Sequence, residues 1–369
     1  MKNKIFITEP FLPPLDEYVE YLKKIWESKQ LTNNGVFHQQ FETELANYLG
    51  VKYVSLFNNA TTALLVGIKA LDLSGEVITT PYSFVATAHA IKWNGLDPVF
   101  VDIELDYCNL DSNKIEDAIT EKTTALLPVH VYGNPCDTDR IKTIAEKYNL
   151  KVIYDAAHAF GVKKDGNSIL NEGDLSILSF HATKVFNTFE GGAIVSHSAE
   201  MKKKIDDLKN FGFQDQITVE GIGINGKMNE MQASMGLLQL KYFDQVIEKR
   251  KRITEIYRKG FKNVKGIRYL ADLEDVKYNY AYFPIFINEN EYGKSRDDVY
   301  NALKKHNIYG RIYFYPLISR FSAYKNLPSS KPANLSMAEK ISEDVICLPI
   351  YPDLSTDQVN YIISVINDG

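Results

Sequence analysis

Apolar and polar positions alternate in two ways along the first two thirds of the chain. Residues 15–29 and 37–49 place apolar side chains three or four positions apart, which predicts two amphipathic helices, the second ending at Gly50. Short apolar runs predict buried strands, at residues 53–57, 76–81, 98–103, 125–130, 152–155, 175–180 and 193–195. The runs at 98–103 and 125–130 are each followed by helical spacing. This alternation indicates an α/β fold with a mostly parallel sheet covered by helices on both faces.

The pattern changes beyond residue 230. An apolar helix at 231–240 leads into a long charged helix at 241–260. The segments at 278–287 and 311–317 then predict strands, separated by a helix at 296–307. We therefore expect a smaller α+β domain at the C-terminal end of the chain.

The expected domain organisation is a large domain at residues 1–245 and a small domain at 246–369. A length of 369 residues, with 45% hydrophobic and 24% charged residues, is enough for two domains and a large core. The net charge of −5 argues against a nucleic-acid partner, which would require clustered basic surface. The basic run at 249–252 is interpreted as the solvated face of the connecting helix.

The sequence also bears on the cellular compartment. No apolar run reaches the length of a membrane span, and the first residues lead into no signal-peptide core. Cys108, Cys136 and Cys347 are scattered and lack metal-ligand spacing, so reduced thiols and no metal site are expected. We therefore expect a soluble protein of the cytoplasm with no membrane partner.

Two titratable residues follow predicted strands closely. Asp155 ends the run at 152–155, and Lys184 follows the run at 175–180. A lysine must be held and partly desolvated to react with an aldehyde at neutral pH. A buried carboxylate needs a cationic partner, and the protonated ring nitrogen of pyridoxal 5′-phosphate is one. The alternatives are that Asp155 caps the next segment and that Lys184 faces water, like most of the 42 basic residues.

Three segments resemble a known family. They are Asp-Ala-Ala-His (155–158), Ser-Phe-His-Ala-Thr-Lys (179–184) and Glu-Gly-Gly-Ala-Ile (190–194), and they are similar to the sugar aminotransferases of the DegT/DnrJ/EryC1/StrS family. The resemblance runs from Pro10 to the C-terminus. It implies a fold-type I enzyme with a seven-stranded type of sheet, which uses pyridoxal 5′-phosphate to aminate nucleotide-linked keto sugars.

The amino-acid sequence at 179–188 is most similar to that of the family's transaminases that form dTDP-4-amino-4,6-dideoxy-D-glucose. This similarity implies dTDP-4-keto-6-deoxy-D-glucose as the sugar substrate and L-glutamate as the amino donor. Lys184 would bind the cofactor covalently and act as general acid-base, and Asp155 would keep the ring nitrogen protonated.

A phosphate site is predicted where the run at 53–57 leads into a helix. Ala60 and Thr61 stand at the start of that helix, where free N–H groups and the helix dipole attract an anion. Simple capping by Asn59 or Thr61 is the alternative, and the family usually has Gly-Thr or Gly-Ser at this point. Ser179 ends another strand and is expected at the same edge of the sheet.

The resemblance implies three further cofactor residues. Phe84 would lie flat on the pyridine ring, although an aromatic residue at a helix start is more often core. His158 stands where the family most often has glutamine, near the 3′-oxygen of the cofactor, and can also donate a hydrogen bond. Asn225 would reach the cofactor phosphate of the neighbouring subunit, which implies a homodimer with shared active sites.

Four residues are candidate substrate contacts. His181 lies beside the lysine segment, with a structural role as the alternative. Tyr315 matches a family segment that closes over the site, and Arg311 could bind the diphosphate or form a surface salt bridge. Asn33 lies in a Thr-Asn-Asn-Gly turn (32–35) that is near the sugar in the family.

Other functions stay open at this point. Amination at C3 of the sugar, or a UDP- or GDP-linked substrate, is the nearest alternative. The family's dehydratases have histidine in place of this lysine, so the presence of Lys184 argues against dehydratase activity. A catalytically silent cofactor-binding or regulatory protein is a third possibility. The family's usual products enter O-antigen, and hence lipopolysaccharide, or antibiotic sugars.

Overall fold

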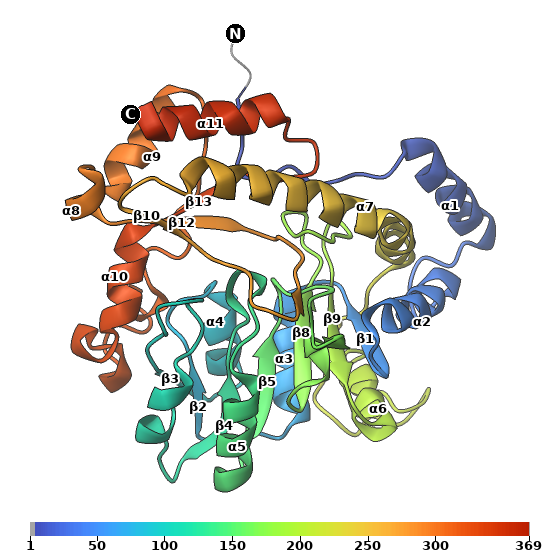
Figure 1. Cartoon of the computed structure of the whole chain (residues 1–369). Helices are drawn as coiled ribbons and strands as arrows, with labels where there is room; N and C mark the ends of the chain where they lie inside the picture. Colours follow the sequence, from blue (N-terminus) through green and yellow to red (C-terminus); the bar gives the residue numbers. More distant parts are fainter. Residues whose placement is uncertain (1–3, 369) are drawn as a thin grey trace.

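The computed structural model describes residues 4–368, and a seven-stranded sheet forms its centre (Figure 1). The strand order is β1-β9-β8-β5-β4-β2-β3. The strands are β1 (Tyr53–Phe57), β2 (Glu76–Thr79), β3 (Asp97–Phe100), β4 (Thr123–Leu127), β5 (Lys151–Asp155), β8 (Leu175–Ser179) and β9 (Gly192–Ser196). All neighbours from β8 to β3 are parallel, and only β9 is antiparallel to its two neighbours. The expected mostly parallel sheet is confirmed.

Helices cover both faces of this sheet. One face packs against α3 (Ala60–Ala70), α4 (Ala86–Trp93) and α6 (Ala199–Leu208). The other face packs against α2 (Val36–Leu49), α5 (Thr138–Tyr148) and the first half of α7 (Glu230–Phe261). Burial on both faces explains why the strands are continuous apolar runs and do not alternate with polar residues. Helix α1 (Leu15–Ser28) projects beside α2 (Figure 1).

The C-terminal part forms a second layer. Its three-stranded antiparallel sheet has the order β10-β12-β13. These strands are β10 (Ile267–Tyr269), β12 (Phe283–Ile287) and β13 (Val345–Leu348), and the helices are α8 (Glu289–Tyr292), α9 (Arg296–Lys305), α10 (Ser336–Asp344) and α11 (Thr356–Asp368). A third, small sheet joins β6 (Lys163–Lys164), β7 (Asn167–Ser168) and β11 (Val276–Lys277). The expected α+β character is present.

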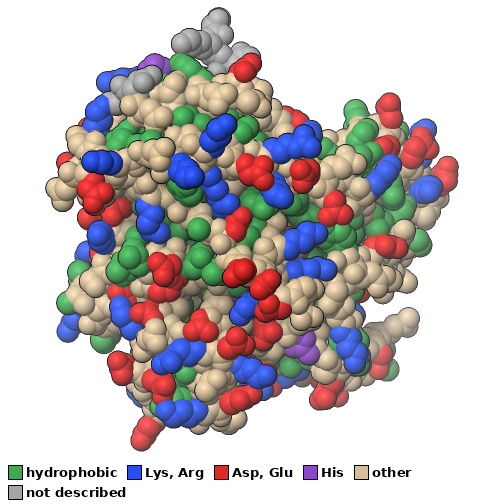
Figure 2. All heavy atoms as spheres, viewed as in Figure 1, with side chains coloured by type: hydrophobic (Ala, Val, Ile, Leu, Met, Phe, Trp, Pro, Cys, Tyr) green, Lys and Arg blue, Asp and Glu red, His purple; other side chains and the backbone are tan. Residues whose placement is uncertain are grey.

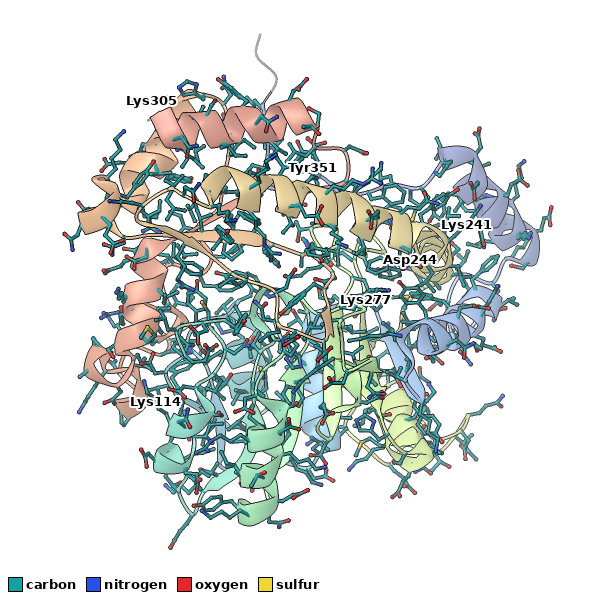
Figure 3. All side chains as sticks on the ribbon, viewed as in Figure 1. Lys114, Lys241, Asp244, Lys277, Lys305 and Tyr351 are labelled. Carbon is teal, nitrogen blue, oxygen red and sulfur yellow. The ribbon has the colours of Figure 1, made fainter. Side chains whose placement is uncertain are left out.

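Helix α7 links the two layers without a break. Phe243 packs in the core of the large sheet, whereas Ile253 and Tyr257 pack in the core of the C-terminal sheet. Lys241 and Asp244, labelled in Figure 3, lie where α7 meets the N-terminal helices: Lys241 Nζ bonds Glu17 and the Tyr48 hydroxyl donates to Asp244. The boundary expected between residues 245 and 246 therefore falls inside a helix. The division of the chain into two domains at this point stays a proposal.

Two expected strands differ from the structure, for the same reason. Residues 311–317 form no strand: only Arg311 pairs, with Cys347, and the carbonyl of Tyr313 then accepts bonds from the hydroxyls of Tyr82 and Tyr132. Similarly, β12 begins at Phe283 and not near residue 278. In both segments hydrogen bonds between side chains and backbone replace those of a sheet.

The helix expected after β3 is also wrong. Two short 3-10 turns, Ser112–Lys114 and Glu116–Ala118, stand in its place. The Glu104 carboxylate accepts the backbone N–H groups that follow it, including those of Tyr107 and Asn109. Such bonds from a side chain to nearby backbone compete with helix formation.

The face shown in Figure 2 carries interspersed positive and negative side chains. Over residues 4–368, none of the helices combines the length and the apolar character that a membrane crossing requires. The same residues contain no group of three or more His, Cys, Asp or Glu side chains suited to a metal ion.

Candidate active site

The carboxyl ends of the central strands bring most of the predicted cofactor residues to one edge of the sheet. Asp155 ends β5 and Ser179 ends β8, and these two strands are direct neighbours. Lys184 lies in the loop between β8 and β9. This is the edge at which ligands bind in open α/β sheets.

Lys184 is held in place by its own loop. Its backbone N–H donates to the carbonyl of His181 at 2.9 Å, and Thr188 N–H donates to Phe180 at the same distance. Its Nζ lies 3.2 Å from the Tyr282 hydroxyl. Burial lowers the pKa of the Lys184 amine to about 8, and the charges of Asp155 and Tyr313 oppose this shift. A neutral, nucleophilic amine is therefore accessible near neutral pH.

Asp155 is a buried carboxylate, 6% exposed, without an ion pair to any residue in the described range 4–368. It accepts bonds from the Thr87 hydroxyl at 2.7 Å and from the Ala157 N–H at 3.1 Å. Burial raises its pKa, against the effects of these two bonds and of the Lys184 charge. A buried carboxylate that lacks a cation fits the protonated ring nitrogen of pyridoxal phosphate.

The first turn of α3 has free amide groups. The Asn59 side chain accepts from Thr62 N–H at 2.8 Å, so it caps the helix, while the N–H groups of Ala60 and Thr61 have no partner within residues 4–368. An added Cβ at Gly192 would lie 2.7 Å from the Ala60 nitrogen, so the start of β9 packs directly under this turn. The cap uses a different N–H group and so leaves the N–H groups of Ala60 and Thr61 free, as a phosphate site would require.

Phe84 and His158 flank this edge. Phe84 comes just before α4, the helix that carries Thr87, and is 61% exposed, so its ring is not core. His158 is buried, and its Nδ1 accepts from Tyr132 N–H at 3.2 Å, which leaves Nε2 as the donor nitrogen. Burial lowers the pKa of His158 well below its usual value, so a donor role suits it better than acid-base exchange.

The candidate substrate residues are more dispersed. Arg311 is exposed, lies 5.1 Å from the Tyr313 ring and forms no salt bridge with any described residue, so its guanidinium remains available to an anion. Tyr315 is 53% exposed and lies under the Arg296 guanidinium. His181 bonds the Thr183 hydroxyl at 2.8 Å within its own loop.

Asn33 and Asn225 form no hydrogen bond or ion pair with Lys184 within the described residues. Asn33 lines a cavity of about 520 Å³ together with Lys209, Asn210 and Lys227. Asn225 is exposed and its carbonyl accepts from the Asn58 side chain at 3.4 Å.

The sequence patterns missed several residues around Lys184. Thr87 bonds Asp155 across 68 positions of the chain, and Tyr282 bonds Lys184 across 98. The hydroxyls of Tyr82 and Tyr132 lie 2.6 Å apart, and both lie within hydrogen-bonding distance of the Tyr313 carbonyl. No local signal marks these contacts. The clustering of aromatic residues at 278–283 and 313–315 was the available hint.

Comparison with known proteins identifies the family of this chain. A profile of the DegT/DnrJ/EryC1/StrS aminotransferase family matches residues 15–367. The chain is 53% identical over 368 residues to a dTDP-4-amino-4,6-dideoxy-D-glucose transaminase of Shigella dysenteriae, and the match covers 100% of both chains.

Solved structures give the same result for the fold. DesI, crystallised in the presence of its TDP-sugar product, has a TM-score of 0.94 and 33% identity, covering 99% of this chain and 93% of that chain. A sugar aminotransferase of Streptococcus pneumoniae in its PLP form has a TM-score of 0.91 and 27% identity, covering 99% and 98%. The fold implied by the sequence resemblance is confirmed. The chain belongs to the DegT/DnrJ/EryC1/StrS aminotransferase family.

Proposed function

We propose that this aminotransferase uses pyridoxal 5′-phosphate to move an amino group from L-glutamate to dTDP-4-keto-6-deoxy-D-glucose. The product is dTDP-4-amino-4,6-dideoxy-D-glucose. The observation that supports pyridoxal 5′-phosphate as the cofactor is the buried carboxylate of Asp155, which has no ion pair and lies at the sheet edge that also holds Lys184. The observation that supports this sugar substrate is the 53% identity, over the whole chain, to a transaminase named for that product.

The protein groups divide the work of holding the cofactor. Lys184 binds its aldehyde carbon, and Asp155 pairs with its ring nitrogen. The N–H groups of Ala60 and Thr61, with Ser179, bind the phosphate, and Asn225 of a second subunit completes that site. Phe84 covers the ring, and His158 Nε2 donates to the 3′-oxygen.

The bound cofactor supplies an electron-withdrawing ring, which stabilises negative charge on the amino donor's α-carbon. Asp155 maintains the protonated ring nitrogen on which that effect depends. Lys184 Nζ, when free of the cofactor, would take the proton from the α-carbon of the amino donor as a general base and would give it to carbon C4′ of the cofactor as a general acid. Its depressed pKa of about 8 suits both roles near neutral pH.

Binding of the sugar nucleotide is assigned to the exposed side of the site. Arg311 binds the diphosphate, because a guanidinium without a carboxylate partner matches phosphate geometry. Tyr315, His181 and Asn33 are proposed sugar contacts. We place the enzyme in the cytoplasm as a homodimer, with its product destined for lipopolysaccharide sugars.

Product analysis tests this function. The purified protein is incubated with pyridoxal 5′-phosphate, L-glutamate and a panel of keto sugars linked to dTDP, UDP or GDP, with the keto group at C3 or C4. Mass spectrometry and NMR of the products should find the 4-amino sugar from dTDP-4-keto-6-deoxy-D-glucose as the preferred product. A Lys184→Ala control should give none and should lack the visible absorption of covalently bound cofactor. Preference for another sugar would refute the substrate, and an active Lys184→Ala variant would refute the mechanism.

A further inference from the structure

We propose that the hydroxyl of Tyr282 is a positioning group of this enzyme, which holds the Lys184 amine in place whenever that amine is free of the cofactor. This inference rests on the proposed function, since it concerns the amine that binds pyridoxal phosphate. The hydroxyl oxygen lies 3.2 Å from Lys184 Nζ, and the centre of its ring lies 5.8 Å from the same nitrogen. No other side chain of residues 4–368 hydrogen-bonds that nitrogen.

The backbone before Tyr282 is fixed on one side by Asn279. The Asn279 amide donates to the carbonyls of His158 at 2.8 Å and Phe160 at 3.0 Å, and its oxygen accepts from Ala281 N–H at 3.1 Å. His158 and Phe160 directly follow the strand that ends in Asp155. The segment that carries Tyr282 is therefore tied to the loop of the cofactor carboxylate.

Arg250 of α7 fixes the same segment from the other side. Its guanidinium is buried, 2% exposed, and donates to the carbonyls of Tyr280 at 3.3 Å and Ala281 at 3.4 Å. Arg250 has no carboxylate partner within residues 4–368. A buried cation that caps the two carbonyls preceding Tyr282 restrains the position of the tyrosine.

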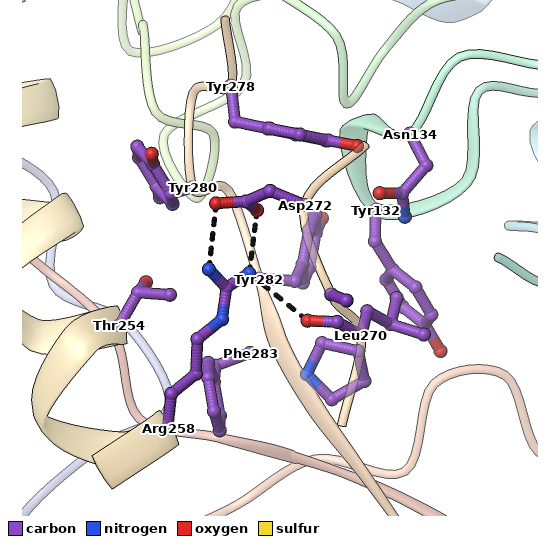
Figure 4. Close-up of a pocket in the computed structure, with 12 residues that line it drawn as sticks. Tyr132, Asn134, Thr254, Arg258, Leu270, Asp272, Tyr278, Tyr280, Tyr282 and Phe283 are labelled. Atoms are coloured by element: carbon purple, nitrogen blue, oxygen red, sulfur yellow. Dashed lines mark hydrogen bonds and ion pairs between the residues drawn. The ribbon is translucent and has the colours of Figure 1, made fainter. Parts of the chain in front are cut away.

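The ring of Tyr282 is enclosed by other rings. Its centre lies 4.7 Å from that of His158, 5.6 Å from Tyr132 and 5.7 Å from Tyr313. Two cavities that Tyr282 lines have volumes of only about 30 and 20 Å³. Figure 4 shows the larger of these cavities, with Tyr282 on its wall and Arg258 paired with Asp272 beside it. Such volumes hold about one water each and leave little room for the ring in these two directions.

A phenol suits an amine that gains and loses a proton. A hydroxyl both accepts and donates hydrogen bonds, so it accepts from the protonated Lys184 amine and donates to the neutral one. Burial raises the pKa of Tyr282, while the charges of Arg250 and Arg311 oppose that shift, so the phenol keeps its own proton. Lys184 also faces the charge of Asp155. Tyr282 thus orients the amine in both states without exchanging a net proton.

The test compares Tyr282→Phe with Tyr280→Phe, a neighbouring tyrosine on the same segment, also on the wall of the larger cavity. The first measurement is the rate at which cofactor-free protein attaches pyridoxal 5′-phosphate to Lys184, trapped by borohydride reduction and read by mass spectrometry of the Lys184 peptide. The second is the single-turnover rate of the holoenzyme with L-glutamate. Pyridoxamine 5′-phosphate, which forms no bond to Lys184, reports the integrity of the site through its dissociation constant.

We expect Tyr282→Phe to slow both rates by about tenfold, the factor that corresponds to about 1.4 kcal/mol and to one hydrogen bond. Its affinity for pyridoxamine 5′-phosphate and its KM for L-glutamate should stay within twofold of wild type, and Tyr280→Phe should change nothing. Equal rates in the two variants would overturn the inference. A weakened affinity for pyridoxamine 5′-phosphate in Tyr282→Phe would also overturn it, because the residue would then be structural. Absence of the Lys184 adduct in wild type would instead refute the proposed function.

Discussion

At the scale of single residues, the two central charges of the site are each disfavoured by burial. The pKa of Asp155 is raised and that of Lys184 is lowered to about 8, in both cases chiefly because the charged form loses water. Each group therefore destabilises the cofactor-free fold when it is charged. A cofactor that gives Asp155 a cation and takes up the Lys184 amine removes both costs.

Asp155→Asn should separate stability from activity. The folded pKa of Asp155 lies above its unfolded value, so the stability of the cofactor-free protein falls as pH rises through that window and stays low above it. Asparagine removes this cost, and we expect the cofactor-free variant to be about 1–3 kcal/mol more stable than wild type at pH 8. The hydrogen bonds of residue 155 can persist in the variant. The Thr87 hydroxyl can accept a bond from the new amide N–H and donate its own proton to the Ser83 hydroxyl, which it also contacts. With pyridoxal phosphate bound, the order of melting temperatures should reverse and kcat should fall about a hundredfold or more.

Thermal melts with and without cofactor, at pH 5 and pH 8, check this prediction. The gain in stability should shrink as the pH falls, because the wild-type carboxylate, whose pKa is raised by burial, then takes up its proton. A cofactor-free Asp155→Asn variant that melts below wild type at pH 8 would contradict it.

The reactivity of Lys184 gives a second prediction at this scale. In cofactor-free protein, labelling by an amine-reactive reagent should reach half its maximal rate near pH 8 at Lys184, whereas ordinary lysines require about pH 10.4. Replacing Asp155 by asparagine should lower the midpoint further, because the carboxylate charge raises the pKa of Lys184. Mass spectrometry of the labelled peptides measures both midpoints. A Lys184 midpoint near pH 10 would show that the amine is open to water.

At the scale of elements, the start of α2 depends on a residue far away in the sequence. The Glu230 carboxylate, 2% exposed at the start of α7, accepts from Phe37 N–H at 2.8 Å and His38 N–H at 2.9 Å. It thereby supplies the cap that Gly35, which has no side chain, does not provide. A Cβ at Gly35 would lie 2.4 Å from the Glu230 carboxyl carbon, so glycine leaves room for this contact.

Glu230→Ala should therefore destabilise the protein by about 2 kcal/mol, because two N–H groups of α2 lose their acceptor in a buried place. Glu230→Gln retains one oxygen and should cost about half as much. Glu44→Ala, at an exposed position of α2, is the matched control and should change stability by less than about 0.5 kcal/mol. Chemical denaturation measures the differences. Equal stabilities of Glu230→Ala and the control would rule out the capping role.

The properties of single elements also explain which parts of the structure could be predicted from the sequence. Strands such as 53–57 and helices such as 37–49 are determined by local periodicity, and the order of these elements predicts the sheet and the edge that holds Asp155 and Lys184. The segment 311–317 was not predictable, because its backbone bonds the hydroxyls of Tyr82 and Tyr132. Thr87 and Tyr282 were missed for a related reason: their partners lie far along the chain, and a single sequence carries no signal for such pairs.

At the scale of the whole molecule, one chain leaves large apolar side chains in water. Trp93 is 81% exposed, Ile217 90% and Ile222 88%. Exposed apolar groups of this size, when they gather on one surface, mark protein–protein contacts. Trp93 and Ile222 line the same pocket and so meet this condition, which supports the proposed homodimer, in which Asn225 of one subunit completes the phosphate site of the other.

Mixing two inactive variants tests that sharing. Lys184→Ala and Asn225→Ala homodimers should each have little activity. After mixed refolding, about a quarter of the wild-type activity should return, because half of the dimers are mixed and each of these has one intact site. Activity assays before and after mixing, with the dimer mass from light scattering, give the result. No recovery in proven mixed dimers would place Asn225 in its own subunit's site or outside any site.

The unbroken 32-residue α7 has a consequence for how the protein comes apart. Because one helix is anchored in both cores, cleavage between residues 245 and 246 would cut it where its side chains are packed, and neither piece would keep a complete interior. Limited proteolysis of the native protein should therefore release no folded fragment of residues 246–369, and calorimetry should record one cooperative transition for the whole chain. We expect the two layers to fold and unfold together as a single cooperative unit.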